Sequence, residues 1–398
     1  MNWCDDVFPL CIVSLLGFAF AFLTGVVLSL VWLERKFLGR LQMRHGPTRV
    51  GPFGTLQSVA DGLKLISKED VRPDWAEPRI FWVAPILVLV PIFMIWLVIP
   101  FSEVLVIRSL DLGLFYIIAL LVLSIVGLVM AGWGSANKYA VLGGLRAAGQ
   151  LISYEIPIIM VIAAIAILAQ SLNLVDVVQA QNPIPYAVIM PLGFFIFFVA
   201  SLAEIGRTPF DIYQAESEVV GGPFVEYSGA HWSVFFFAEY INTFAVGVLT
   251  ALLFLGGWNW SMIAIQYVGQ DHWFVPEWSL PILQGMLISP WSELIAFGEV
   301  ITKAYLVILV IFWIRGTFPR FRIDQLMALG WKGLVPLSFL VVLMNAVYLF
   351  YGWPTWSLTL MNVVVMTILA VYLYRRAQTI PSSPTIKLIP ARQLRHAR

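Results

Sequence analysis

Long apolar stretches, separated by shorter polar ones, organise the chain. A helix needs about 20 apolar residues to cross the roughly 30 Å hydrocarbon core of a bilayer, and nine stretches qualify. They run approximately over residues 11–33, 80–101, 114–135, 150–171, 186–204, 233–257, 294–315, 334–352 and 356–374. The first stretch ends in charged residues rather than a small-residue cleavage site, so we interpret it as a retained span. The pattern predicts an all-α, polytopic integral membrane protein, with one transmembrane domain over residues 1–375 and a basic cytoplasmic tail over 376–398.

The composition supports this fold class. The 398 residues are 60% hydrophobic and only 12% charged, and the mean hydropathy is +0.87. A water-soluble domain does not need that much apolar surface. The formal net charge of +1 shows no basic or acidic bias, so nothing indicates binding to nucleic acid or to an acidic substrate.

The basic residues lie almost entirely on one side of the predicted membrane. If the N-terminus is outside, all of the 24 Lys and Arg residues except Arg108 and Lys303 fall in inner loops or in the tail. Basic residues accumulate on the cytoplasmic side of membrane proteins. The sequence therefore predicts an external N-terminus and a cytoplasmic C-terminus, and the long, charged inner loops are where function should be sought.

Motifs for redox cofactors and metals are absent from the sequence. Cys4 and Cys11 are too few for a disulfide framework or an iron–sulfur cluster, and the four histidines are scattered singly without an HExxH pattern. No Walker A loop and no strand followed by GxGxxG appears. We therefore expect this chain to bind no metal or cofactor, so that partner subunits would carry any nicotinamide, flavin or metal centre.

The first inner loop contains an amphipathic helix, predicted over residues 54–68. One face is apolar and consists of Leu56, Val59, Ala60, Leu63 and Ile66. Polar positions, Asp61 among them, lie elsewhere on the helix. Two interpretations remain: a helix that merely lies at the lipid headgroups, or a gate beside a lipophilic access path.

Two predicted spans contain ionisable residues far from the membrane surface. Glu155 lies about six residues, on the order of 9 Å, inside the inner end of its span. Glu299 and Lys303 are four residues apart with the acid first, the favourable order for a helical ion pair. An unpaired charge at such depth costs several kcal/mol, so we expect these side chains to face protein or water.

Acidic residues are densest between 204 and 240. They are Glu204, Asp211, Glu216, Glu218, Glu226 and Glu239, and Arg207 is the only Lys or Arg in the same segment. A solvated loop is one interpretation. The admixture of Phe, Tyr, Gly and Pro favours a packed loop instead, where crowded carboxylates cannot all ionise and some can exchange protons near neutral pH.

Several blocks of sequence resemble a known family. They are ERKFLGRLQMRHGP, QSVADGLKLISKED, GLRAAGQLISYEIP, RTPFDIYQAESEVV, VEYSG, AEY and RGTFPRFRIDQLMALGWK, in this order between Glu34 and Lys332. They resemble the quinone-site membrane subunit of respiratory complex I, which is designated H or 1 in NADH-quinone oxidoreductases. Blocks of this length, in the right order and at the right spacing, make chance similarity negligible.

The resemblance implies a function and a set of partners. It implies a membrane subunit of a proton-translocating NADH:quinone oxidoreductase, a translocase located in the bacterial plasma (inner) membrane. Such a subunit forms the quinone chamber and tunnel, binds the quinone-reducing and iron–sulfur subunits of the peripheral arm, and contacts other membrane-arm subunits and lipids. Quinone would be the substrate, while FMN and iron–sulfur clusters would reside in partner subunits.

The resemblance also implies roles for individual residues. The residues implied at the quinone chamber and the arm interface are Glu34, Arg35, Lys36, Arg40, Arg44, Arg49, Asp61, Arg207 and Asp211. The acids implied in the proton path and in coupling are Glu155, Glu204, Glu216, Glu218, Glu226 and Glu239. No catalytic residue is assigned, because the family's head-group ligands belong largely to the neighbouring quinone-reducing subunit.

The sequence departs from the family pattern at Thr48, at Ile205-Gly206 and at Gly222-Pro223. None of these departures removes a charge, but Pro223 lacks a backbone donor and so alters the expected loop shape. Two alternatives stay open. One is a homologous membrane subunit of a ferredoxin- or hydrogenase-linked complex; the other is a secondary ion transporter, although no internal repeat supports it.

Overall fold

The apolar stretches of the sequence form long helices in the structure, a computed structural model that describes residues 8–259 and 291–379. Within these ranges there is no β-strand. The longer helices are α1 (Phe8–Leu41), α3 (Pro78–Ile95), α4 (Gly113–Gly134), α5 (Lys138–Ala169), α8 (Pro191–Glu204), α10 (Gly229–Phe254), α13 (Trp291–Thr317), α15 (Val335–Tyr351) and α16 (Thr355–Thr379). The short ones are α2 (Gln57–Ser67), α6 (Leu174–Gln179), α7 (Tyr186–Ile189), α9 (Glu216–Val219) and α14 (Ile323–Leu329). The predicted all-α membrane architecture is confirmed.

Eight helices of the described residues are long and apolar enough to cross a membrane, whereas nine stretches were predicted. The difference lies at 186–204, which is split into α7 and α8. Met190 leaves the helical conformation, with φ −129° and ψ 63°, and Pro191 begins the next helix. Proline has no backbone N–H and clashes with a preceding helical turn, so it starts helices more readily than it continues them. The 14 residues of α8 span about 21 Å, which is short of a full crossing.

Two further helices begin earlier along the chain than hydropathy predicted. α5 starts at Lys138 rather than near 150, and its first turn is capped by the Asn137 side chain, which accepts a hydrogen bond from the Tyr139 backbone N–H at 2.9 Å. α14 continues through a π-helical turn, Gly330–Leu334, into α15, so that this helix begins at Ile323 rather than near 334. In both cases the hydropathy pattern marks the apolar part of a helix whose polar end extends further.

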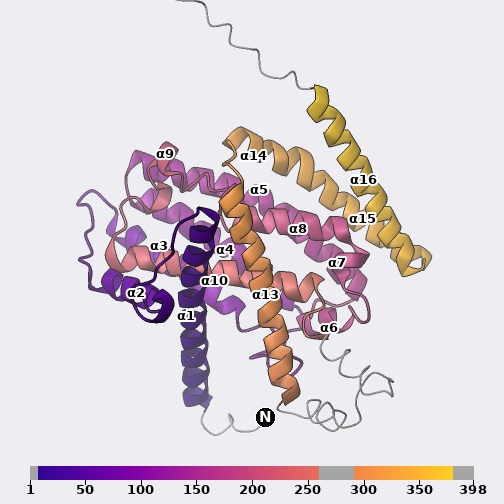
Figure 1. The fold of residues 1–398 in the computed structure, drawn as a ribbon, viewed down its shortest axis with the longest axis horizontal. Coiled ribbons are helices and arrows are strands. Elements are labelled where there is room, and N and C mark those ends of the chain that lie inside the picture. The colour runs from indigo at the N-terminus through magenta and orange to yellow at the C-terminus, as the bar shows by residue number, and fades with distance from the viewer. Residues whose placement is uncertain (1–7, 260–290, 380–398) are drawn as a thin grey trace, which may run out of the picture.

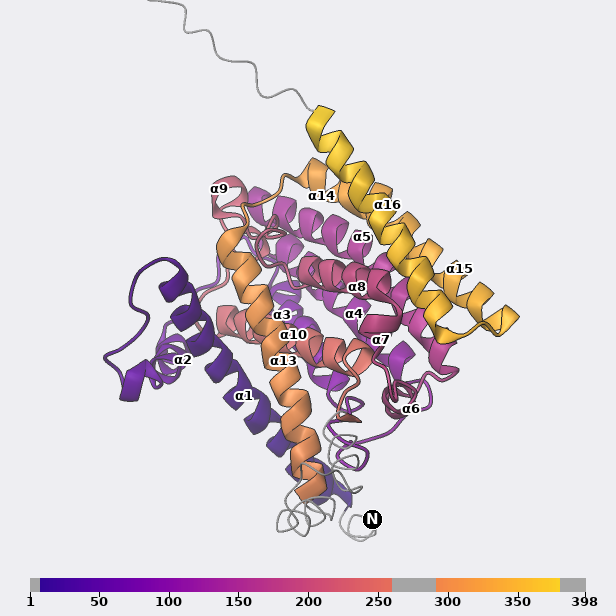
Figure 2. The ribbon, with the colours of Figure 1, turned by 45° about the vertical axis from the view of Figure 1, so that its right-hand side comes forward.

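Helix α10 is the centre of the molecule. In the apolar stretch of α10, 78% of the residues are buried. The corresponding share in α16, at the edge of the molecule, is 11%. A helix that is apolar all round requires neighbours on every side, and α10 packs against α1, α2, α3 and α13. Figures 1 and 2 show α13 crossing in front of α10, with α5 and α8 on the side of the molecule away from α1.

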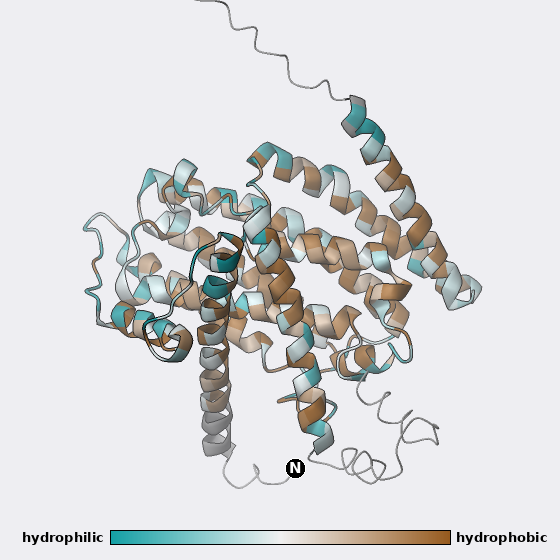
Figure 3. Ribbon diagram, in the orientation of Figure 1, coloured by the Kyte–Doolittle hydropathy of each residue, from teal (hydrophilic) through white to brown (hydrophobic). Residues whose placement is uncertain are grey.

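Polar residues gather at particular ends of these helices. Figure 3 shows hydrophilic residues at the upper ends of α1 and α16 and around α9 and α14, with hydrophobic residues along the helices between. α2, within the predicted amphipathic segment, packs against α1 and α10. Its Leu63 and Ile66 side chains remain 64% and 70% exposed. The predictions for Cys4, His272, His396 and the tail beyond Thr379 lie outside the described residues.

Candidate functional site

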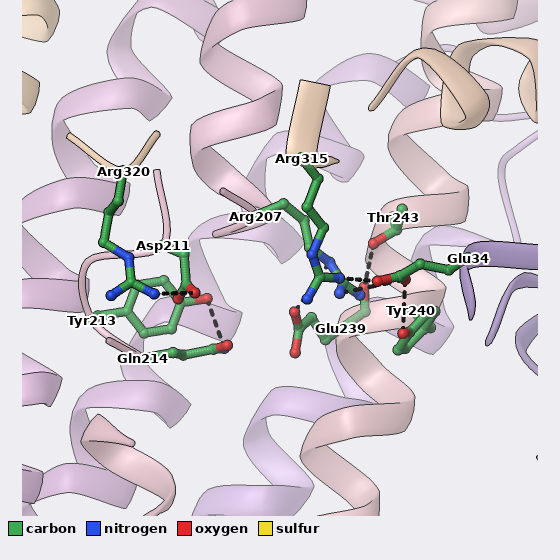
Figure 4. A network of polar contacts seen from close by, with 10 residues as sticks. All are labelled: Glu34, Arg207, Asp211, Tyr213, Gln214, Glu239, Tyr240, Thr243, Arg315 and Arg320. Carbon is green, nitrogen blue, oxygen red and sulfur yellow. Dashed lines mark hydrogen bonds and ion pairs between the residues drawn. The ribbon is translucent and has the colours of Figure 1, made fainter. Parts of the chain in front are cut away.

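Three charged side chains from distant parts of the sequence meet in the interior. Arg207 follows α8, Glu34 belongs to α1 and Glu239 to α10 (Figure 4). Arg207 and Glu34 are only 5% and 4% exposed. The Arg207 Nη1 atom lies 3.6 Å from Glu34 Oε2, and its Nε atom lies 3.2 Å from Glu239 Oε1. One guanidinium group therefore joins two acids that are 205 residues apart in the chain.

Two more residues complete this cluster, and sequence reasoning did not assign either to it. The Tyr240 hydroxyl donates a hydrogen bond of 2.8 Å to Glu34 Oε2, and its ring lies 4.5 Å from the guanidinium carbon of Arg207. Arg315, near the end of α13, forms an ion pair with Glu34. We call Glu34, Arg207, Glu239, Tyr240 and Arg315 the central cluster. Its two acids and two arginines balance, which is how charges become tolerable in a buried setting.

Asp211 lies beside the central cluster and has its own partner. Arg320, in the turn after α13, places its Nη2 atom 3.3 Å from Asp211 Oδ2 (Figure 4). Burial raises the pKa of Asp211, and the positive charges of Arg320 and Arg315 only partly offset that effect. The sequence showed Arg207 as the single cation of its segment; the fold supplies two more from the end of α13.

The loop that follows α8 is fastened at both ends. The buried Gln150 side chain donates through Nε2 to the carbonyl oxygens of Ala203 and Phe210, each at 2.8 Å. The backbone N–H of Phe321 donates to the Pro209 carbonyl at 3.1 Å. These bonds hold Arg207 in place between α5 and the end of α13.

A polar cavity of about 430 Å³ opens beside the central cluster. Arg207, Glu239 and Arg315 line it, together with Asp211 and the exposed Glu216. A polar cavity bounded by both signs of charge can take up a proton or a polar head group without burying an unpaired charge.

Glu155 of α5 and Glu204 at the end of α8 form a second acidic group. α5 packs against α8, and the two carboxylates are close enough to repel each other. One Glu155 carboxylate oxygen is buried without a hydrogen-bond partner among the described residues. A smaller cavity, lined by both Glu204 and Glu239, lies between this pair and the central cluster.

The remaining acids of the segment have other neighbours. Glu218 pairs with Arg146 at 2.6 Å near the surface. Glu226 accepts a hydrogen bond of 2.5 Å from Asn137, the residue that caps α5. The structure therefore separates Glu216, which faces the polar cavity, from Glu218, which does not line it.

A larger groove of about 980 Å³ lies between α1, α2, α3 and α10. Its walls are mostly apolar, for example Phe20 and Phe237, and Arg35, Arg44 and Asp61 lie at its polar end. Arg35 and Asp61 form an ion pair that joins α1 to α2. Burial by itself raises the pKa of Asp61, but the hydrogen bond and charge of Arg35 outweigh it, so that the pKa lies below its usual range.

The other basic residues of the first loop point elsewhere. Lys36 and Arg40 line a separate groove of about 350 Å³ on α1, together with Trp32 and Phe37. Arg49 is exposed and forms no ion pair with another described residue. The structure thus distributes the predicted first-loop residues over two grooves and the open surface.

The predicted pair in α13 is confirmed. Lys303 Nζ lies 2.5 Å from Glu299 Oε1 and donates to the carbonyl oxygens of Leu255 and Gly257 at 2.8 and 2.7 Å. These carbonyls lie just beyond the C-terminal end of α10, where backbone acceptors lack helical partners. Over residues 8–259 and 291–379, no group of three or more His, Cys, Asp and Glu side chains is arranged to hold a metal ion.

Fold and site together define a class of protein: an all-helical, polytopic membrane protein with a balanced cluster of charges in its interior, beside a large apolar groove. Comparison with known proteins identifies the group within that class. The NADH dehydrogenase family matches residues 13–346, and the chain belongs to this family.

Curated relatives agree with the family match. In the NADH-quinone oxidoreductase of Dehalococcoides mccartyi strain CBDB1, the component designated H is 41% identical over 319 residues, which cover 80% of this chain and 81% of the relative. The corresponding components in Brevibacillus brevis and Geobacillus kaustophilus are 40% and 43% identical over 331 and 334 residues. These alignments cover 83% and 84% of this chain and 91% of each relative.

Proposed function

We propose that this protein is the membrane subunit of a proton-translocating NADH:quinone oxidoreductase, that it forms much of the quinone chamber, and that it couples quinone reduction to proton movement. The observation that carries the proposal is the central cluster, where acids and arginines are buried beside an apolar groove. The names of the relatives supply the electron donor and the acceptor. FMN and iron–sulfur clusters then belong to partner subunits.

The groove between α1, α2, α3 and α10 is the access path for quinone in this proposal. Its apolar walls suit an isoprenoid tail, and its polar end, with Arg35, Arg44 and Asp61, suits a head group that moves towards the peripheral arm. α2 covers this groove, which favours the gate over the interpretation of a helix that only lies at the headgroups. Exposed basic residues such as Arg49 are placed at the interface with acidic surfaces of the arm.

Coupling follows from the arrangement of the acids. A quinone that gains electrons needs protons, and a change of charge in the chamber alters the protonation of carboxylates nearby. Glu216, Glu239 and Asp211 line the polar cavity, and Glu204 and Glu155 continue the series between the helices. We propose a location in the bacterial plasma membrane, with the loops after α1, α8 and α13 on the cytoplasmic side, as the distribution of basic residues predicts.

The alternatives are weaker on specific observations. The relatives given above all belong to NADH-quinone oxidoreductases, which disfavours a hydrogenase- or ferredoxin-linked complex. The membrane-embedded Lys303, a feature that a transporter would share, binds carbonyl groups after α10 and so has a structural task.

The test is isolation of the protein from its native membrane in mild detergent, with identification of all co-purifying chains by mass spectrometry and an assay of NADH:quinone reduction. We expect flavin, iron–sulfur and antiporter-like subunits, and activity that a quinone-site inhibitor blocks. Recovery with a nickel–iron hydrogenase, or recovery of this chain alone, would refute the proposal.

A further inference from the structure

A small cavity separates the central cluster from the Glu155–Glu204 pair, and its polar lining is largely uncharged. Glu204 and Glu239 contribute to it from α8 and α10, and between them it is lined by Tyr213, Gln214 and Asn242. Gln214 and Glu239 also line the 430 Å³ polar cavity. These two residues therefore stand where the cavities adjoin, and the small cavity continues from them towards Glu204.

Tyr213 is the most enclosed polar residue of this lining. It is 4% exposed, and its hydroxyl oxygen accepts a hydrogen bond of 3.3 Å from Gln214 Nε2 (Figure 4). Burial raises the pKa of the Tyr213 hydroxyl, so it remains protonated. After accepting from Gln214, the hydroxyl still has one lone pair and its own proton to offer.

Two glycines make room for Tyr213, and both are required there. Gly206 has φ +67°, and a Cβ atom on it would lie 2.2 Å from the Tyr213 hydroxyl oxygen. Gly222 has φ +61°, and a Cβ atom on it would lie 1.8 Å from the Tyr213 carbonyl oxygen. A side chain at either position would both strain the backbone and displace the tyrosine. The loop is built around this ring, although neither glycine belongs to the central cluster.

Asn242 supplies an independent sign of a hydrated passage. It lies on α10 three residues after Glu239, hence on the same face. Its Oδ1 atom is buried and has no hydrogen-bond partner within the described part of the chain. Buried amide oxygens are rarely left unpaired, and the cavity of about 50 Å³ has room for at least one water molecule, which needs on the order of 10–15 Å³.

We propose that Tyr213, Gln214 and Asn242 form a neutral relay that passes protons between Glu239 and Glu204. For a proton that enters at Glu239, a water held by Gln214 takes it from the carboxyl group and gives one of its own to the free lone pair of the Tyr213 oxygen. The original hydroxyl proton leaves towards a water held by Asn242 and thence to Glu204. The net change is that Glu239 loses one proton and Glu204 gains one, and rotation of the hydroxyl resets the relay.

Neutral groups suit this position for an electrostatic reason. An ionised side chain between two acids would either repel them or trap the proton, and in a buried site of low dielectric constant that energy is large. Neutral hydroxyl and amide groups let the proton pass, because they do not bind it as strongly as an ionised side chain would. The inference rests on the proposed function, because it needs quinone chemistry at one end to drive the proton.

The test is Tyr213→Phe in the complete complex, purified with its partners and reconstituted into liposomes. We expect normal assembly and normal NADH oxidation by an artificial acceptor that bypasses quinone. Quinone-coupled proton pumping should fall about tenfold, equivalent to about 1.4 kcal/mol in activation free energy. The ratio of rates in H₂O and D₂O should rise, because proton transfer becomes limiting; a merely structural defect would not raise it.

Tyr305→Phe is the matched control, because it also removes a partly buried hydroxyl, one that is hydrogen-bonded to Ser29. Tyr305 lines neither of the two cavities. If Tyr213→Phe fails to assemble, Asn242→Leu, which is nearly isosteric, decides the question with the same pumping assay. Full pumping by either assembled variant, or an equal loss in Tyr305→Phe, would overturn the relay. Absence of quinone-dependent activity in the wild type would instead overturn the proposed function.

Discussion

At the scale of single residues, the charges of the interior differ in how far neighbouring side chains compensate them. Glu34 accepts from Tyr240 and pairs with two arginines, so its ionised form is fully compensated. Removing one partner of such a buried group costs about 3–5 kcal/mol, because the remaining charge is left without compensation. Glu216, in contrast, is exposed at the edge of the polar cavity, so its replacement does not remove a buried contact.

Replacement of Glu216 tests this distinction. Glu216→Gln should leave the complex assembled and lower coupled quinone reductase activity by about tenfold, or about 1.4 kcal/mol, since the carboxyl group proposed to take part in coupling is lost from the cavity. Glu218→Gln is the matched control: it removes a charge two residues away that pairs with Arg146 outside the cavity. Normal coupled turnover by assembled Glu216→Gln, measured in sealed vesicles, would contradict the assignment.

Asp211 gives a prediction for pH dependence. Its pKa is raised from the ordinary value of 3.8 by burial, so the native state binds a proton more readily than the unfolded chain does. Stability from this group is therefore greatest at low pH and declines as pH rises from about 4 through the raised pKa. Relative to Asp211→Asn, the wild type should lose thermal stability over that interval.

The measurement is the unfolding midpoint of the purified complex from about pH 4 to about pH 7, for the wild type and for Asp211→Asn. Asp324→Asn, which removes an exposed acid near Arg320, serves as the control and should leave the pH profile unchanged. Parallel profiles for the wild type and Asp211→Asn would show that the raised pKa is not realised.

Part of the site could be predicted from residues alone. Arg207 is the only Lys or Arg within the acidic segment, so composition alone made a pairing with one of the acids there a reasonable expectation. Arg315 was placed at the end of a span, where a basic residue is ordinary, and nothing in local sequence shows that α13 brings it to Glu34. Tyr240 is uncharged, so the distribution of charges along the sequence did not indicate that it belongs to the central cluster. Tertiary packing, rather than any pattern within one segment, makes these contacts.

At the scale of elements, α2 is the helix whose attachment matters most. The Arg35–Asp61 pair joins its middle to α1, and after its end Asp70 pairs with His231 at the start of α10. The Val71 backbone N–H also donates to the Ser228 hydroxyl at 2.9 Å. The helix thus covers the large groove while held by three polar contacts, and its apolar Leu63 and Ile66 remain exposed.

Weakening the Arg35–Asp61 ion pair should affect the access of quinone to the groove more than the chemical step. The Arg35 and Asp61 side chains are 43% and 25% exposed, and such pairs contribute up to about 1 kcal/mol. Asp61→Asn should therefore raise KM for a long-tailed quinone by no more than about fivefold, with kcat little changed. Asp74→Asn, an exposed acid further along the loop, is the control. A loss confined to kcat would place Asp61 in the chemistry instead.

The elements also show where hydropathy succeeds and where it fails. It located every long helix of the part of the chain that the structure describes, because apolar runs of span length are unambiguous. It missed the break at Met190-Pro191, because both residues are apolar and the run is uninterrupted in hydropathy. Backbone chemistry, which a hydropathy average ignores, divides that stretch into α7 and α8.

At the scale of the whole molecule, the two ends of the described chain lie far apart. α1 begins at the bottom of Figure 1, while α16 ends at the top. Ends on opposite sides require an odd number of crossings. Among residues 8–259 and 291–379, the eight long helices give an odd number when the short α8 completes a ninth. This arrangement agrees with the predicted external N-terminus and cytoplasmic C-terminus, which stay a prediction.

Orientation can be measured with single cysteines in a variant whose Cys4 and Cys11 are replaced by serine. Thr48→Cys in the first loop should react with a membrane-impermeant maleimide only in inside-out vesicles. Ser109→Cys, between α3 and α4, should react only in right-side-out vesicles, because the charge asymmetry places that loop outside. The reverse pattern would invert the topology and move the polar cavity to the external face.

Because of the groove between α1, α2, α3 and α10, the relevant concentration of quinone is its concentration in the lipid, not in the water. A lipophilic quinone dissolves in the bilayer, and a groove with walls such as Phe20 and Phe237 samples it there rather than in water. Half-saturation would then correspond to a mole fraction of quinone in lipid. Vesicles enlarged with inert phospholipid at fixed total quinone would turn over more slowly, although nothing in the aqueous phase had changed.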